Sequence, residues 1–169
     1  MINKNMFNRK VKRKIKNFFK IFKLKYLRNF FLCLKYPFLK IQTETYPWVS
    51  GYDFTWLDEI PIGWRKGFGI QMCEDIKQYL KDNHIKNYHI RQMKEKWNVL
   101  HIYDNANDDF YEKIHKKYEK ISEETCVFCG KPSKWISCNG WIESVCDDCK
   151  NKLINERGFS KFDKLKNEK

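Results

Sequence analysis

The chain has 169 residues, of which 17% are aromatic, and 34 Lys or Arg against 21 Asp or Glu give it a formal net charge of +13. This length suits one domain with appendages. The longest uninterrupted apolar run, 30–34, is far too short to span a bilayer. Lys and Arg interrupt the apolar residues of the basic N-terminus and no small-residue cleavage site follows, so we do not expect a secretory signal.

The basic charge is concentrated at one end of the chain. Residues 1–43 hold thirteen Lys or Arg and no Asp or Glu, which leaves 21 basic residues in 44–169, as many as there are acidic ones. A block of one charge sign is typical of an arm that binds an anionic surface. We therefore divide the chain into a basic arm (1–43), a mixed body (44–121), a metal module (122–158) and a charged tail (159–169).

The arm is predicted to form a basic amphipathic helix, followed by a second apolar patch at 30–34 and then by Pro37. Its apolar residues recur at steps of three and four: Val11, Ile15, Phe18, Phe19, Phe22 and Tyr26. The basic residues that we expect to bind an anionic partner are Lys12, Arg13, Lys16, Lys20, Lys23 and Arg28.

The body is predicted to be α+β, with a helix, two strands and a second helix in that order. Pro and Gly break up Tyr46–Trp64, which we expect to be an irregular covering loop. A helix should run from about Trp64 to Leu80, and strands over Tyr88–Lys94 and Val99–Tyr103 should join at a turn. Residues 105–107 should cap the second helix. The predicted buried residues of the two helices are Gly69, Met72, Cys73, Ile76, Tyr79 and Leu80, then Phe110, Ile114, Tyr118 and Ile121.

Two Cys-x-x-Cys pairs, Cys126 with Cys129 and Cys146 with Cys149, are separated by sixteen residues. Four thiolates at this spacing are typical of one tetrahedral zinc, and a full set of protein ligands leaves no position for water or substrate. We therefore expect one structural zinc; the alternatives are a redox dithiol and a chance clustering of cysteines. The fifth cysteine of this region, Cys138, is interpreted as a bystander thiol.

The secondary structure around these pairs indicates a treble-clef finger. The first pair ends at Gly130, which suits the tight turn of a zinc knuckle. A hairpin should follow over 135–145 around Asn139-Gly140. A helix should begin at the second pair and run to about Arg157, with Gly158 as its stop. An uneven set of seven cysteines with zinc spacing favours a reducing, cytoplasmic location.

A catalytic site is not evident. If the strands bury Ile90, Leu100 and Ile102, the outer face of the hairpin should carry four other side chains: His89, Arg91, His101 and Tyr103. Such a face could hold a phosphate or move a proton. No carboxylate or nucleophile is placed with them, so an ordinary solvated face is the preferred interpretation. The other two histidines, His84 and His115, are expected to be exposed.

Several motifs resemble those of a set of uncharacterised small zinc-finger-bearing proteins of bacteria and their phages. The family's strand pair is matched by Met93-Lys94-Glu95-Lys96-Trp97, and its knuckle by Cys126 to Cys129 with Gly130-Lys131-Pro132. The C-terminal end of the family pattern is matched by Gly140-Trp141 and the second cysteine pair. The family tends to have Gly and Arg where this chain has Asn98 and His101. The resemblance covers about 46–150 and implies a zinc-bearing α+β protein, with the arm as an addition.

Four functions are weighed. The first is a non-catalytic zinc protein whose arm binds nucleic acid, and we favour it slightly. The second is peripheral attachment to an anionic membrane through the Lys- and Phe-rich helix. The third is a phage or mobile-element protein that binds a host protein. The fourth is a small nuclease-like enzyme, which we disfavour because the chain lacks an acidic metal site.

Overall fold

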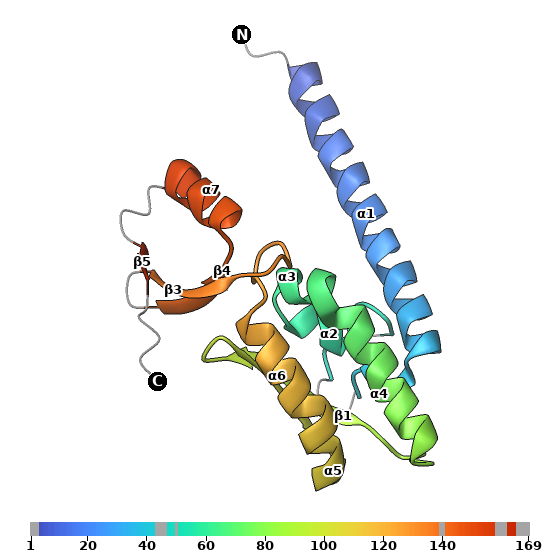
Figure 1. Ribbon diagram of the computed structural model, residues 1–169. Helices are drawn as coiled ribbons and strands as arrows, with labels where there is room; N and C mark the ends of the chain where they lie inside the picture. Colours follow the sequence, from blue (N-terminus) through green and yellow to red (C-terminus); the bar gives the residue numbers. More distant parts are fainter. Residues whose placement is uncertain (1–3, 43–46, 50, 139–140, 158–161, 165–169) are drawn as a thin grey trace. The chain divides into compact units, whose positions relative to one another are not determined.

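The computed structural model describes residues 4–42, 47–49, 51–138, 141–157 and 162–164 (Figure 1). Helices combine with small antiparallel sheets, which confirms the α+β class. The chain divides into two compact units, Met1–Thr55 and Trp56–Lys169. The first unit holds the predicted arm and residues 44–55 of the predicted body, and the second unit holds the rest of the chain.

The first unit is dominated by one long helix, α1, over Lys4–Lys35. The apolar patch at 30–34 is part of this helix, which stops shortly before Pro37 because proline disfavours helical backbone in the residue before it. A short 3-10 turn, η1, covers Pro37–Leu39. The rings of Tyr26 and Phe30 pack edge-on against Tyr52, with ring centroids 5.8 and 5.1 Å apart.

The second unit begins with short helical turns, α2 (Trp56–Glu59) and α3 (Ile62–Trp64), which run into a π turn, η2 (Arg65–Gly69), and then into α4 (Ile70–Asp82). The helix predicted from Trp64 is thus confirmed. The loop predicted for Tyr46–Trp64 is wrong over α2 and α3, because turns of three or four residues are too short to show a helical period. Trp56, Leu57 and Trp64 are fully buried there.

The predicted hairpin is present as β1 (Ile90–Lys96) and β2 (Val99–Asp104). Met93 faces Ile102 in this antiparallel pair and both are buried, with an irregular register near Gln92. A second helical segment follows as α5 (Asp108–Phe110), a π turn η3 (Tyr111–His115) and α6 (Lys116–Glu123). The predicted cap is also present, since the Asn107 side chain accepts a hydrogen bond from the amide of Phe110.

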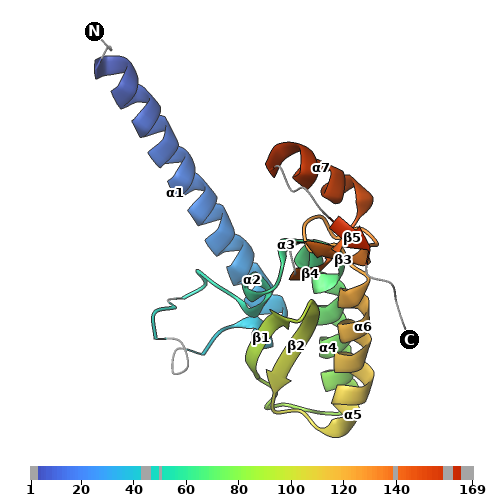
Figure 2. The same cartoon turned by 90° about the vertical axis from the view of Figure 1, so that its left-hand side faces the viewer.

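Three tyrosine–aspartate hydrogen bonds join the elements of this body, in which α6 packs against β2 of the hairpin (Figure 2). Tyr79 of α4 donates to Asp109 at the start of α5. Tyr118 of α6 donates to Asp75 of α4 at 2.7 Å, and Tyr88 donates to Asp104 at the end of β2 at 2.8 Å. The three bonds therefore cross-link segments that lie 16 to 43 residues apart in sequence.

The C-terminal part forms a second sheet beside a helix. Strands β3 (Lys134–Cys138) and β4 (Trp141–Val145) make the predicted hairpin, and α7 (Asp147–Arg157) follows. The turn residues 139–140 and the predicted stop Gly158 lie outside the described residues. A further strand, β5 (Phe162–Lys164), pairs with β3, giving the order β4-β3-β5. The sequence does not predict this strand, which lies in the segment interpreted as a charged tail, because three residues are too few to show alternation.

Candidate metal centre

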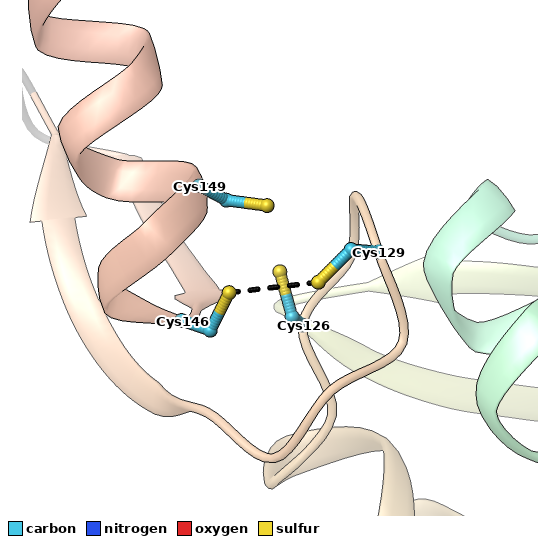
Figure 3. Close-up of side chains that lie close together, drawn as sticks. All are labelled: Cys126, Cys129, Cys146 and Cys149. Carbon is cyan, nitrogen blue, oxygen red and sulfur yellow. Dashed lines mark hydrogen bonds between the residues drawn. The ribbon is translucent and has the colours of Figure 1, made fainter.

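The four cysteines of the two pairs converge in the C-terminal part of the second unit. Cys126 and Cys129 lie on the loop that follows α6, whereas Cys146 immediately precedes α7 and Cys149 lies in its first turn (Figure 3). The backbone amide of Gly130 donates to the carbonyl of Cys126 at 3.0 Å, which closes the loop into a tight turn. Gly130 has a φ of 84°, a conformation that glycine adopts readily and other residues rarely adopt, so the tight turn predicted at this glycine is confirmed.

All four Sγ atoms lie within 4.8 Å of one another. Thiolates bound to one zinc at about 2.3 Å would stand roughly 3.8 Å apart, so the observed cluster fits a single ion with small adjustments. The Sγ atoms of Cys129 and Cys146 are 3.5 Å apart, well beyond a disulfide bond. The four cysteines could therefore hold one metal ion.

The surroundings of the sulfurs favour ionisation of Cys126. Burial opposes the thiolate, but backbone amides of Cys146, Cys129 and Phe128 outweigh it and lower the pKa of Cys126 to about 7. Burial raises the pKa of Cys146 and of Cys149, and the neighbouring sulfurs add to the rise at Cys149. Crowded thiols of this kind lose their protons when a dication binds among them. The surroundings thus favour the thiolate of Cys126, whereas ionisation of Cys146 and Cys149 would be promoted by a bound cation.

The first cysteine pair is docked on the body rather than carried on a free loop. The amide of Gly63 donates to the carbonyl of Val127 at 2.8 Å, and the indole Nε1 of Trp64 donates to the carbonyl of Thr125 at 3.0 Å. A Cβ atom on Gly63 would lie 2.0 Å from the carbonyl oxygen of Cys126. Only glycine at this position of α3 allows the knuckle backbone to approach so closely.

A second connection joins the hairpin turn of β1 and β2 to the metal module. The side chain of Asn98 donates to the hydroxyl of Ser144 at 2.7 Å and accepts from the amide of Ser144 at 2.8 Å. The amide of Val127 donates to the carbonyl of Ser144 at 2.9 Å. Both Asn98 and Ser144 are buried, so Ser144 on β4 holds together the hairpin turn and the knuckle.

The predicted outer face of the hairpin exists in part. Ile90, Leu100 and Ile102 are buried, as the prediction required. The rings of His101 and Tyr103 stack with centroids 6.4 Å apart, and Tyr103 is exposed. The other two members lie at the far end of the hairpin: Arg91 is exposed at the register irregularity, and His89 is half-buried with its amide bonded to Asn105.

The prediction that His115 is exposed is wrong. Its side chain is buried, and its Nε2 lies 2.8 Å from Oδ2 of Asp104, which also accepts the hydroxyl of Tyr88. His115 ends the π turn η3, whose wider turn changes the phase of the helix and brings this residue inward. A regular 3.6-residue period could not have revealed this cluster. His84, in contrast, is exposed as predicted.

The basic residues predicted for the arm are described only in part. Lys20, Lys23 and Arg28 are exposed on α1, and the guanidinium of Arg28 donates to the side chain of Asn29. The side chains of Lys12, Arg13 and Lys16 lie outside the described residues, as does that of Cys138. Cys73 is fully buried in α4, as predicted.

Comparisons with models of protein families, with curated proteins and with solved structures find no match for this chain. Within the described residues, no helix combines the length and apolar character needed to cross a membrane. The function must therefore be argued from the site and the surface.

Proposed function

We propose that the four cysteines hold one structural zinc ion in a treble-clef finger and that the protein acts by binding nucleic acid through its basic arm. The observation that supports the zinc is that the four sulfur atoms lie within 4.8 Å of one another. All-thiolate sites of this kind are structural, because no coordination position stays open for a reacting water. The loop, hairpin and helix start that bear the two pairs follow the order of a treble clef.

A metal analysis tests the zinc. Protein purified under reducing conditions should contain one zinc per chain, and Cys149→Ser should lose it. Cys73→Ser is the matched control, because Cys73 is buried in α4 away from the cluster and should leave the zinc content unchanged. Metal-free wild-type protein that keeps its fold would contradict a structural zinc.

The charge of the arm supports the nucleic-acid half of the proposal. Residues 1–43 contain thirteen basic residues and no acidic ones. These basic side chains would neutralise the phosphates of a nucleic acid and release their counterions. If the arm contacts six to ten phosphates, the affinity for nucleic acid should fall about 10³- to 10⁵-fold when the salt concentration rises from 50 to 200 mM. The double variant Lys20→Glu, Lys23→Glu should lose affinity and flatten this salt dependence. Lys86→Glu, Lys120→Glu, equal in charge and exposed on the second unit, serves as the control.

One observation favours an anionic membrane surface as a second candidate. Large apolar residues of α1 are exposed at steps of three and four, with exposed fractions from 42 to 67%: Ile21, Leu24, Leu27, Phe31 and Leu34. Nucleic acid would not bury these apolar side chains, whereas a membrane would bury them at the boundary between the lipid headgroups and the acyl chains. Flotation of the protein with vesicles rich in anionic lipid, set beside a gel-shift assay, separates the two candidates.

A further inference from the structure

The hairpin of β1 and β2 presents an outer face that is both basic and aromatic. Pairing brings Lys94 opposite His101 and Gln92 opposite Tyr103. The Nζ atom of Lys94 lies 5.3 Å from the centre of the Tyr103 ring, on which His101 also stacks. These contacts hold Tyr103 in one orientation while leaving it 44% exposed. The face is therefore ordered before any partner arrives.

The turn at the end of this ribbon carries the most exposed large apolar side chain of the described residues. Trp97 is 81% exposed, and its φ is 56°. A two-residue turn with positive φ at both positions normally uses Asn or Gly, because bulky side chains are strained in this region. The next residue, Asn98, follows that rule and is anchored to Ser144. The Trp97 side chain is not buried in the fold, and its backbone conformation is unfavourable for tryptophan. Neither stabilises the protein, so we attribute to the indole ring a contact with a partner.

The electrostatics of the face indicate the sign of the partner. Arg91, Lys94 and Lys96 lie along β1, and none of them is paired with a carboxylate in the part of the chain that the structure describes. The carboxylate of Glu95, the one acidic residue of β1, accepts the amide of Asn98 at 2.6 Å and is thereby engaged in the turn. Lys94 lies beside the exposed Tyr103 ring, and two further unpaired cations lie on the same strand, an arrangement that suits a chain of phosphates with exposed bases.

We infer that this face, formed by Lys94, Trp97, His101 and Tyr103, binds single-stranded nucleic acid by stacking bases on the two exposed rings. The inference rests on the proposed function, which it narrows from nucleic acid in general to unpaired strands. Bases in a duplex have their π-faces covered by neighbouring pairs, whereas unpaired bases can stack on Trp or Tyr regardless of their identity. The cations of β1 then contact the phosphates between the stacked bases.

The test measures binding of the full chain to a labelled thymidine or uridine strand of about 15 nucleotides and to a duplex of equal length. Trp97→Asn removes the indole and places a residue that positive φ favours, so the variant keeps its fold. Tyr103→Ser removes the second ring. Tyr111→Ala is the matched control, because Tyr111 is exposed to a similar extent, 42%, on η3.

Each exposed ring should account for roughly a 5- to 150-fold loss of affinity for the single strand when removed. Duplex binding, driven by phosphates alone, should change little in either variant. Addition of the single strand should also quench part of the tryptophan emission of the wild type, and this part should vanish in Trp97→Asn.

Single-strand affinity that is unchanged in both variants overturns the inference and leaves the proposed function standing. This is also the result expected if the face serves a protein partner instead. Equal losses for single strand and duplex overturn the stacking argument. If the wild type binds neither nucleic acid at about 50 mM salt, the nucleic-acid part of the proposed function falls together with the inference.

Discussion

The docking of the knuckle on α3 makes Gly63→Ala the sharpest test of how the metal centre is held. The added Cβ would lie 2.0 Å from the carbonyl oxygen of Cys126 and 2.6 Å from the carbonyl carbon of Val127, both of them backbone atoms. Ordinary contact needs at least 3.4 Å, so the two backbones must separate by more than 1 Å.

The expected loss of stability follows from the contacts that this separation disturbs. Overpacking costs about 1–3 kcal/mol. The hydrogen bond from Gly63 to Val127 is broken and the bond from Trp64 to Thr125 is stretched, and each such loss inside the fold costs about 1–3 kcal/mol. Replacing Gly by Ala in a helix returns about 1 kcal/mol. The three losses cost about 1–3 kcal/mol each and the substitution returns about 1 kcal/mol, so the net destabilisation should be about 2–8 kcal/mol.

Urea unfolding followed by tryptophan fluorescence measures this loss, and zinc release to a chromophoric chelator reports on the metal site. Gly69→Ala is the control, since its Cβ would meet a side-chain methyl of Leu57 at 3.3 Å and make only ordinary contacts with Trp64 and Arg65, at 3.6 and 3.8 Å. It should change stability by less than about 1 kcal/mol. A Gly63→Ala protein that unfolds at the wild-type urea concentration and holds zinc equally well would refute the reasoning.

Three further predictions follow from the body and the turn. Trp97→Asn should raise the free energy of unfolding by about 1 kcal/mol, measured in urea, because it relieves a bulky residue at positive φ; a lower stability would show that the indole packs on the fold. Hydrogen bonding to Asp109 raises the pKa of Tyr79 to about 12, so stability should fall as pH rises from 10 through 12, and Tyr79→Phe should reduce that fall. Burial opposes ionisation of Asp104, but hydrogen bonds from His115, the amide of Ala106 and Tyr88 lower its pKa below 3.8. The stability that ionised Asp104 contributes should therefore be lost as pH falls below about 4. The free energy of unfolding of Asp104→Asn, measured over the same pH range, should not show this loss.

The sequence predicted most elements of the second unit because their signals are local. The spacing of the cysteines, the apolar stripe of α4 and the alternation along β2 each act within one element, and the structure confirms them. The interactions that join the elements could not be predicted in the same way. The burial of His115 depends on the π turn η3, and the role of Gly63 depends on a loop more than sixty residues away in sequence.

These long-range contacts change how the metal centre should be understood. Read along the chain, the four-cysteine segment resembles an independent module attached to the body. In the structure, the knuckle carbonyls of Thr125 and Val127 accept hydrogen bonds from α3, and Ser144 binds the turn that presents Trp97. An ion that fixes the knuckle would therefore also fix the end of the β1–β2 hairpin, because Ser144 contacts both. Loss of zinc should then weaken binding at the exposed rings as well as the fold of the finger, which makes the metal a structural support for the proposed nucleic-acid surface.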